Sequence, residues 1–187
     1  MPIAIDGDGT ITGVSVGGLP DGIVDVDMLA SGATTFSKYA IVSDVKSAGT
    51  HAGGFTSGAW RTRDLNTEID PDSIVSISSN QFTLQAGTYM IDWKSPAFGV
   101  NTNQSRLYNV TDSSVTASGS PGYSYNNEGT IYVNHFSVGS TRITLTAAKA
   151  FEIQHQCTTT RVSWGLGFAG NFGIDEIYTV VKIFKEA

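Results

Sequence analysis

The sequence has little from which a disulfide framework, a membrane anchor or a highly charged surface could be built. Its 187 residues include one cysteine, Cys157, so no disulfide can form within the chain. Charged residues make up 15% of the chain, below the roughly 25% of typical soluble domains. It also lacks an apolar run of about 18 residues and a signal-peptide pattern. We therefore expect a globular protein made in a cytoplasm, with Cys157 as a buried thiol.

Basic residues are absent from the first part of the chain. Residues 1–35 hold five of the seventeen acidic residues and none of the eleven basic ones. The formal net charge is −6, and no basic stripe of the kind that binds nucleic acid is present. We expect no nucleic-acid partner, and any charge-guided docking should involve this acidic segment.

What the sequence does contain is a series of short alternating segments separated by Gly, Ser and Asn. The stretch Phe82–Ile91, FTLQAGTYMI, predicts a strand, a tight Gly-centred turn and a second strand. In the following residues Tyr89, Ile91 and Trp93 alternate with polar residues, as in a strand with one buried face. Strands are expected at 36–46, 58–65, 73–78, 80–84, 88–96, 105–111, 130–138, 141–147, 151–157, 161–168 and 176–184. Many strands without crossover helices predict an all-β, antiparallel double-sheet jelly roll over residues 36–187.

Residues 1–35 differ from the rest of the chain in composition and pattern, and they are expected to form an extended arm. Their apolar residues are too scattered to make a core. Gly-Asp-Gly and Gly-Gly-Leu-Pro-Asp-Gly are turn sequences, and Asp25 could cap one helical turn. Such an arm is expected to lie against a partner, a neighbouring subunit or the body of the protein itself. The candidate anchoring residues are Ile3, Ile5, Ile11, Val14, Leu19, Met28 and Leu29.

The strand region resembles the jelly-roll head of the tumour-necrosis-factor (TNF) and complement-head superfamily. The most specific match is Phe82-x-Leu-x-Ala-Gly-x-Tyr-x-Ile, which looks like a hairpin of that family. TRDLN (62–66), RLYNVTD (106–112) and ITLTAAKAFEIQH (143–155) follow the family's order. The resemblance implies a homotrimer.

The last strand is apolar on both faces, which is consistent with cover by a neighbouring subunit. The candidate trimer residues are Tyr178, Val180, Ile183 and Phe184. The alternative is a core strand within one chain.

The arm sequence ITGVSVGGLPDGIVDVDMLA (11–30) resembles N-terminal modules of tailed-bacteriophage virion proteins. The two resemblances together imply a virion structural protein with an attachment arm and a TNF-like knob. Because no fibrous shaft separates them, we expect a capsid decoration or cement protein whose partner is the major capsid protein. The alternative is the receptor-binding tip of a short tail fibre, with tail proteins and a host surface glycan as partners.

The motifs that could carry chemistry lack the context they need. Gly165–Gly170 matches G-x-G-x-x-G but is not followed by a predicted helix. Gly13–Gly17 matches the nucleophile elbow, but nothing upstream of Gly13 can supply the large α/β sheet that an elbow needs. No paired carboxylates or nucleophile–base arrangement emerges, so we expect neither an enzyme nor a cofactor or metal site. An ion on a trimer axis is the alternative, with His135 as the best candidate ligand.

A polar segment at 113–129 is expected to be a long loop between strands. It is rich in Ser, Gly and Asn and contains Tyr123, Tyr125 and Asn126. Tyrosine among small polar residues is typical of recognition loops, so these three residues are the candidate ligand contacts. The alternative is a flexible connection.

Overall fold

The computed structural model describes residues 4–5, 11–12, 36–127 and 131–186. The chain divides into two compact units, residues 1–35 together with residue 187, and residues 36–186. In the first unit, β1 (Ala4–Ile5) pairs antiparallel with β2 (Ile11–Thr12). The second unit, called the knob below, contains two β-sheets.

The first sheet of the knob has five strands in the order β13-β8-β15-β3-β5. Its three central strands, β8, β15 and β3, are long, and every pairing is antiparallel. The strands are β13 (Asn134–Leu145), β8 (Gly87–Phe98), β15 (Glu176–Glu186), β3 (Phe36–Lys46) and β5 (Thr67–Ile69).

The second sheet has six strands, five of them in the order β10-β9-β14-β7-β6, while β4 also pairs with β14. The strands are β10 (Ser114–Ser124), β9 (Asn101–Asn109), β14 (Lys149–Cys157), β7 (Gln81–Leu84), β6 (Val75–Ser78) and β4 (Arg61–Thr62). A separate short pair joins β11 (Asn126–Asn127) to β12 (Ile131–Tyr132).

The chain passes repeatedly from one sheet to the other, as in a jelly roll. β7 belongs to the six-stranded sheet, β8 to the five-stranded sheet and β9 again to the six-stranded sheet; β13, β14 and β15 alternate in the same way. The described part of the chain contains no helix, and so none that could cross a membrane. The predicted all-β antiparallel jelly roll is confirmed.

The two sheets enclose one main core. Phe82 and Phe151 of the six-stranded sheet lie with ring centroids 5.8 Å apart, and Ile91 and Ile183 of the five-stranded sheet are fully buried in the same cluster. A smaller cluster contains Phe55, Ala97, Val100 and Cys157, so the predicted burial of Cys157 is confirmed. All of these residues belong to the knob.

The predicted hairpin at Phe82–Ile91 is wrong. β7 and β8 lie in different sheets and do not pair with each other. The turn at Gln85–Gly87 crosses between the layers, with Gly87 at a φ of +149°. Because Phe82, Leu84, Tyr89 and Ile91 all have 0% exposure, the segment supplies core residues from both sheets.

Glycines inside strands account for two further corrections. Most of the predicted strands 130–138 and 141–147 belongs to one strand, β13 (Asn134–Leu145), which the short β12 precedes. Gly139 lies against the Trp93 indole, and a Cβ there would be 2.0 Å from that ring. The predicted loop 113–129 is mostly strand β10. A Cβ on its Gly122 would be 1.9 Å from the His135 ring, so this glycine allows close packing within a strand.

Two expected strands are largely irregular. Of residues 58–65, only Arg61–Thr62 form a strand. Residues 161–168 lie in the long connection before β15, where Arg161 and Phe55 form an isolated antiparallel bridge.

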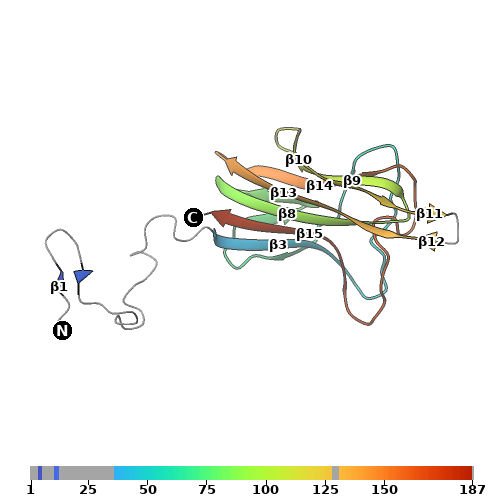
Figure 1. Ribbon diagram of the computed structural model, residues 1–187, viewed down its shortest axis with the longest axis horizontal. Coiled ribbons are helices and arrows are strands. Elements are labelled where there is room, and N and C mark those ends of the chain that lie inside the picture. Colours follow the sequence, from blue (N-terminus) through green and yellow to red (C-terminus); the bar gives the residue numbers. More distant parts are fainter. Residues whose placement is uncertain (1–3, 6–10, 13–35, 128–130, 187) are drawn as a thin grey trace. The chain divides into compact units, whose positions relative to one another are not determined.

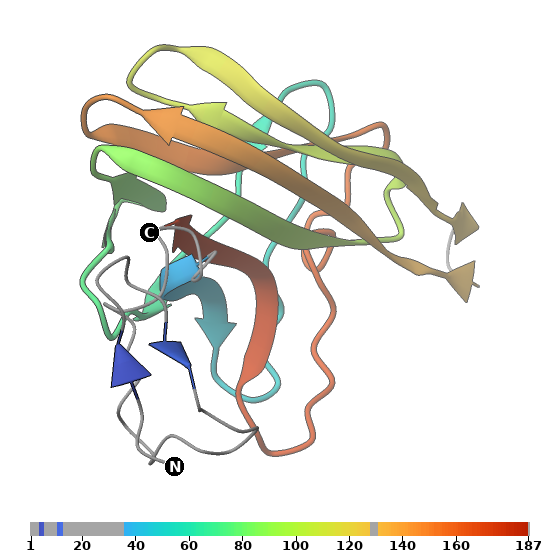
Figure 2. The same cartoon turned by 60° about the vertical axis from the view of Figure 1, so that its left-hand side comes forward.

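The sandwich has two distinct ends (Figures 1 and 2). At one end Phe36, the first residue of the knob, pairs with Glu186, and Gly87 pairs with Leu145. At the other end Phe98 pairs with Asn134, and β9 begins at Asn101. Whatever residues 1–35 contact, they join the knob at the Phe36 end.

Candidate functional surfaces

The outward side of the five-stranded sheet carries several exposed or half-buried apolar side chains. The strand register places Phe184 opposite Met90 and Tyr39 in one apolar row, whereas Val180 lies between Lys94 and Ser43. Tyr39, Phe136 and Val138 are 45–50% exposed. We call this surface the apolar face, defined by Tyr39, Ile41, Met90, Phe136, Val138, Val180 and Phe184.

Charged residues occupy the middle of the apolar face. A shallow hollow of about 230 Å³ is lined by Asp92, Trp93, Lys94, Val180 and Lys182. Lys182 and Asp92 lie directly opposite each other in the register, with Ile41 on the other side of Lys182. The apolar face therefore combines apolar rows with charges of both signs, which a partner would have to match.

The four predicted trimer residues divide between this face and the core. Val180 and Phe184 lie half-buried on the apolar face, whereas Tyr178 and Ile183 are buried within the chain, at 4% and 0% exposure. The expectation is corrected for these two, because a side chain enclosed by its own chain offers no surface to a partner. The cause is a bulge between Ile177 and Val180, which turns both Tyr178 and Thr179 inward.

Most of the predicted arm residues lie outside the described residues. Ile5 and Ile11 belong to β1 and β2 and are partners in that short ladder. Ile3, Val14, Leu19, Met28 and Leu29, and the helical turn expected at Asp25, fall outside the described ranges.

The outward side of the six-stranded sheet has a different chemistry. Amide and other polar side chains alternate along β9 and β14, and the register places Gln156 opposite Gln104 and Gln154 opposite Arg106. The Arg106 guanidinium lies 4.0 Å from the Trp60 ring centre. We call this surface the amide face, defined by Trp60, Thr102, Gln104, Arg106, Glu152, Gln154, Gln156 and Thr158.

Tyr123 and Tyr125 lie at the edge of the amide face and not in a long loop. Tyr123 is in β10 opposite Thr102, and it is 55% exposed. Its ring centroid is 6.2 Å from that of Tyr125. Asn126, the third candidate ligand residue, begins β11 and pairs with Tyr132.

A polar layer lies between the two sheets near the Asn101 end. Asn103 Oδ1 is 3.1 Å from His155 Nε2 and 3.3 Å from His135 Nδ1. Burial, then the charges of Arg63 and His135, hold the pKa of His155 well below its ordinary value. His135 therefore faces the interior, which corrects its expected place as a ligand on a trimer axis.

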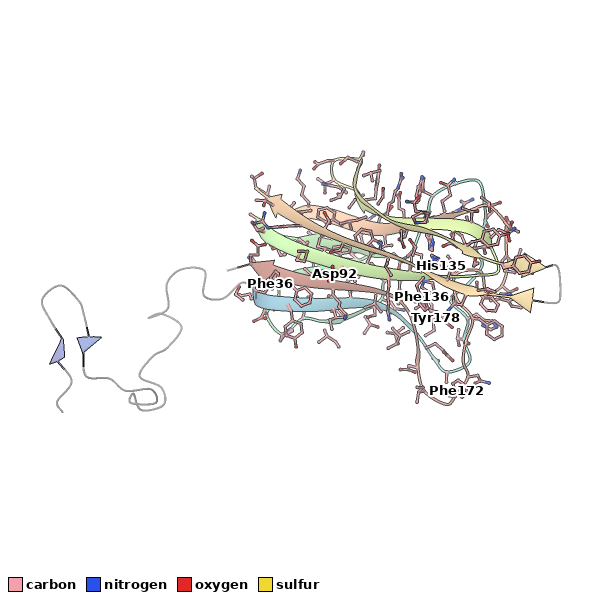
Figure 3. The ribbon with its side chains drawn as sticks, viewed as in Figure 1. Phe36, Asp92, His135, Phe136, Phe172 and Tyr178 are labelled. Carbon is pink, nitrogen blue, oxygen red and sulfur yellow. The ribbon has the colours of Figure 1, made fainter. Side chains whose placement is uncertain are left out.

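Two carboxylates, Glu176 and Asp70, organise loops. Glu176 accepts hydrogen bonds from the backbone N–H groups of Gly49, Gly170 and Asn171, at 3.1, 3.0 and 2.7 Å. These bonds lower the pKa of the Glu176 carboxyl and fix the loop that presents Phe172 at its tip (Figure 3). Asp70 accepts from the N–H groups of Ile74 and Val75.

Sequence reasoning missed Trp60, Gln104 and Gln156 as surface candidates. The alternation of Glu152, Gln154 and Gln156 within the predicted strand 151–157 is a signal for one polar face. Nothing in the sequence indicates that Trp60 lies against Arg106, because the two are far apart along the chain.

Comparison with solved structures identifies the architecture. The chain is similar to the Eiger TNF of S. frugiperda, with 12% identity, a TM-score of 0.53, and coverage of 82% of this chain and 94% of that one. It is also similar to the globular domain of the zebrafish complement 1qA protein (13% identity, TM-score 0.48, 79% and 96% covered). Murine APRIL matches with 6% identity, a TM-score of 0.48, and 79% and 98% covered. The fold is thus a TNF-like jelly roll. No protein-family model and no curated protein matches the sequence.

Proposed function

We propose that the chain forms a homotrimer in which the apolar face of each knob is covered by its neighbours. The observation that carries this proposal is the combination on one sheet of exposed Tyr39, Phe136 and Val138 with half-buried Val180 and Phe184. Exposed apolar patches of this kind mark interaction surfaces. A closed ring buries the same patch on every copy, at roughly 25 cal/mol per Å² of apolar area.

The trimer is proposed to be a bacteriophage capsid decoration or cement protein, assembled in the host cytoplasm and held on the virion by residues 1–35. Two features support this role. The arm resembles virion-attachment modules and carries no Lys or Arg, and residues 36–186 form a compact unit of their own. Its work is mechanical, clamping neighbouring capsid proteins, and the proposal includes neither a catalytic step nor a cofactor.

Deletion of residues 1–35 tests this role. The shortened chain is expected to remain a folded trimer but to lose binding to particles that lack the protein, measured by co-sedimentation. The full-length chain is the matched control, and antibody labelling of particles reports whether it sits on the head. Unchanged particle binding by the shortened chain would contradict anchoring by the arm.

A second candidate is the receptor-binding tip of a short tail fibre. It is favoured by the exposed Tyr123 and Tyr125. Tyr123 lies opposite Thr102 at the start of β9, beside the amide face. Labelling on the tail, together with inhibition of adsorption by free protein, would support this candidate over the first.

A further inference from the structure

The amide face contains a hollow at the end of the sandwich remote from Phe36. Its volume is about 190 Å³, and its walls include Trp60, Thr102, Gln104, Gln156 and Thr158. These residues come from the start of β9, the end of β14 and the segment before β4. The hollow thus has one aromatic wall and otherwise mostly polar residues, and Asn103 and Cys157 complete its lining.

The aromatic wall is held in place without a ligand. The Arg106 guanidinium lies 4.0 Å from the Trp60 ring centre and 5.1 Å from that of Tyr108. Arg106 Nε in turn donates to Gln154 Oε1 at 2.8 Å. Because the cation is stacked and hydrogen-bonded, Trp60 has little freedom to lose when something binds against it.

The amides beside Trp60 have hydrogen-bonding capacity left over. Gln104 Nε2 donates to the Gly119 carbonyl at 2.8 Å, and its Oε1 accepts no hydrogen bond from residues 36–127 and 131–186. The Gln156 side chain has no hydrogen-bond partner among residues 36–127 and 131–186. An amide supplies both donors and acceptors, which is what the hydroxyl groups of a sugar require.

A second aromatic group lies along the same face. Tyr123 stands opposite Thr102 across β9 and β10, and Thr102 is also in the wall of the hollow. Tyr125 packs beside Tyr123. Aromatic side chains with one apolar face and one polar edge suit ligands that are themselves apolar on one side and polar at the rim.

From this arrangement we propose that the amide face binds a neutral carbohydrate. One sugar ring lies with its C–H face against Trp60 and its hydroxyls on Gln104 and Gln156, and a longer chain continues toward Tyr123. A neutral ligand is favoured because the nearby cation, Arg106, is already engaged by Trp60 and Gln154. The inference is independent of the trimer, since the amide face is on the opposite side of the sandwich from the apolar face.

The test is binding of the full-length protein to a printed panel of neutral and acidic oligosaccharides, followed by titration of the best neutral one. Trp60→Ala is expected to weaken its Kd at least 10-fold, and Trp60→Phe to restore part of the loss. Gln156→Leu, which keeps the side-chain size, should weaken binding about 5-fold. Ser118→Ala, an exposed position on the same sheet, is the matched control and should bind like the parent protein.

The outcomes that overturn the proposal are distinct from those that overturn the trimer. No binding to any neutral saccharide, a preference for acidic ones, or equal binding by the parent and Gln156→Leu would each refute the neutral carbohydrate site. Gln156→Leu keeps the test decisive even if Trp60→Ala unfolds the knob. The mass of the same samples reports the oligomer separately, so either proposal can fail alone.

Discussion

The two outward faces of the sandwich share one core but differ in what they expose. The apolar face presents Val180 and Phe184 on a central strand, with rings such as Tyr39 beside them. On the amide face the corresponding central strand, β14, presents Glu152, Gln154 and Gln156. The proposed trimer accounts for this difference, because it covers the apolar face with neighbouring copies and leaves the amide face in water.

The largest expected effect comes from placing a charge on the apolar face. Val180→Arg introduces a guanidinium opposite Lys94 and two residues before Lys182 on the same strand. A trimer would bury three of these guanidinium groups. An uncompensated buried charge costs about 3–5 kcal/mol, so we expect at least a 1,000-fold loss of association, measured by sedimentation equilibrium.

Its matched control is Ser118→Arg, the same substitution at an exposed residue of the other sheet. This variant is expected to keep the mass of the parent protein. If both variants dissociate, or neither does, the claim that the apolar face and not the amide face holds the copies together is refuted.

A smaller effect is expected from a substitution in the interior that the two faces share, measured as the free energy of unfolding. Arg63 is fully buried and donates to Thr179 Oγ1, the Pro96 carbonyl and the Leu166 carbonyl. Burial lowers its pKa to about 10, opposed by the charges of Asp44 and Asp64. Arg63→Met leaves these acceptors unpaired, and we expect the free energy of unfolding to fall by about 3 kcal/mol in urea titrations.

The exposed neighbour provides the control for this change. Arg61→Met removes the same side chain two residues earlier, where it is exposed and, within residues 36–127 and 131–186, donates only to the Thr56 carbonyl at 3.3 Å. Its effect on unfolding should stay within about 0.5 kcal/mol. Equal losses for the two variants would show that the buried guanidinium does not stabilise the sandwich.

These residues also show how far the sequence could predict the structure. The alternation of Tyr89, Ile91 and Trp93 predicted the buried side of β8 correctly, because core burial with a period of two needs no tertiary information. The outward-facing residues of the last strand were predicted wrongly for a local reason. The bulge at Tyr178–Thr179 shifts the phase of the alternation, so the apolar residues could be recognised but not assigned to a side.

The amide face was harder to predict than the core. β10 contains Ser, Gly and Pro in place of apolar residues, and its strand character depends on pairing with β9. Its Gly122 is required by the His135 ring, which approaches from a distant strand. The site around Trp60 is formed by segments that are far apart in the sequence, and no local sequence pattern shows that they come together.

The smallest expected effect concerns the shared interior. The folded knob holds His155 neutral, with its pKa well below the ordinary value, while the unfolded chain takes up a proton below about pH 6.5. The free energy of unfolding is therefore not reduced by His155 above about pH 6.5. Below that pH it decreases as the pH falls toward the lowered pKa, by up to about 1.4 kcal/mol per pH unit.

Urea titrations at several pH values check this expectation. His155→Gln should flatten the dependence between pH 7 and 5 relative to the parent protein. Identical slopes for the two proteins would show that His155 is not the titrating group.

The most direct test of the central claim is the mass of the full-length chain in dilute solution, measured by light scattering. Cover of the apolar face by neighbouring copies predicts three times the chain mass of 19.8 kDa, unchanged on dilution through the micromolar range. A particle of 19.8 kDa under the same conditions would contradict it.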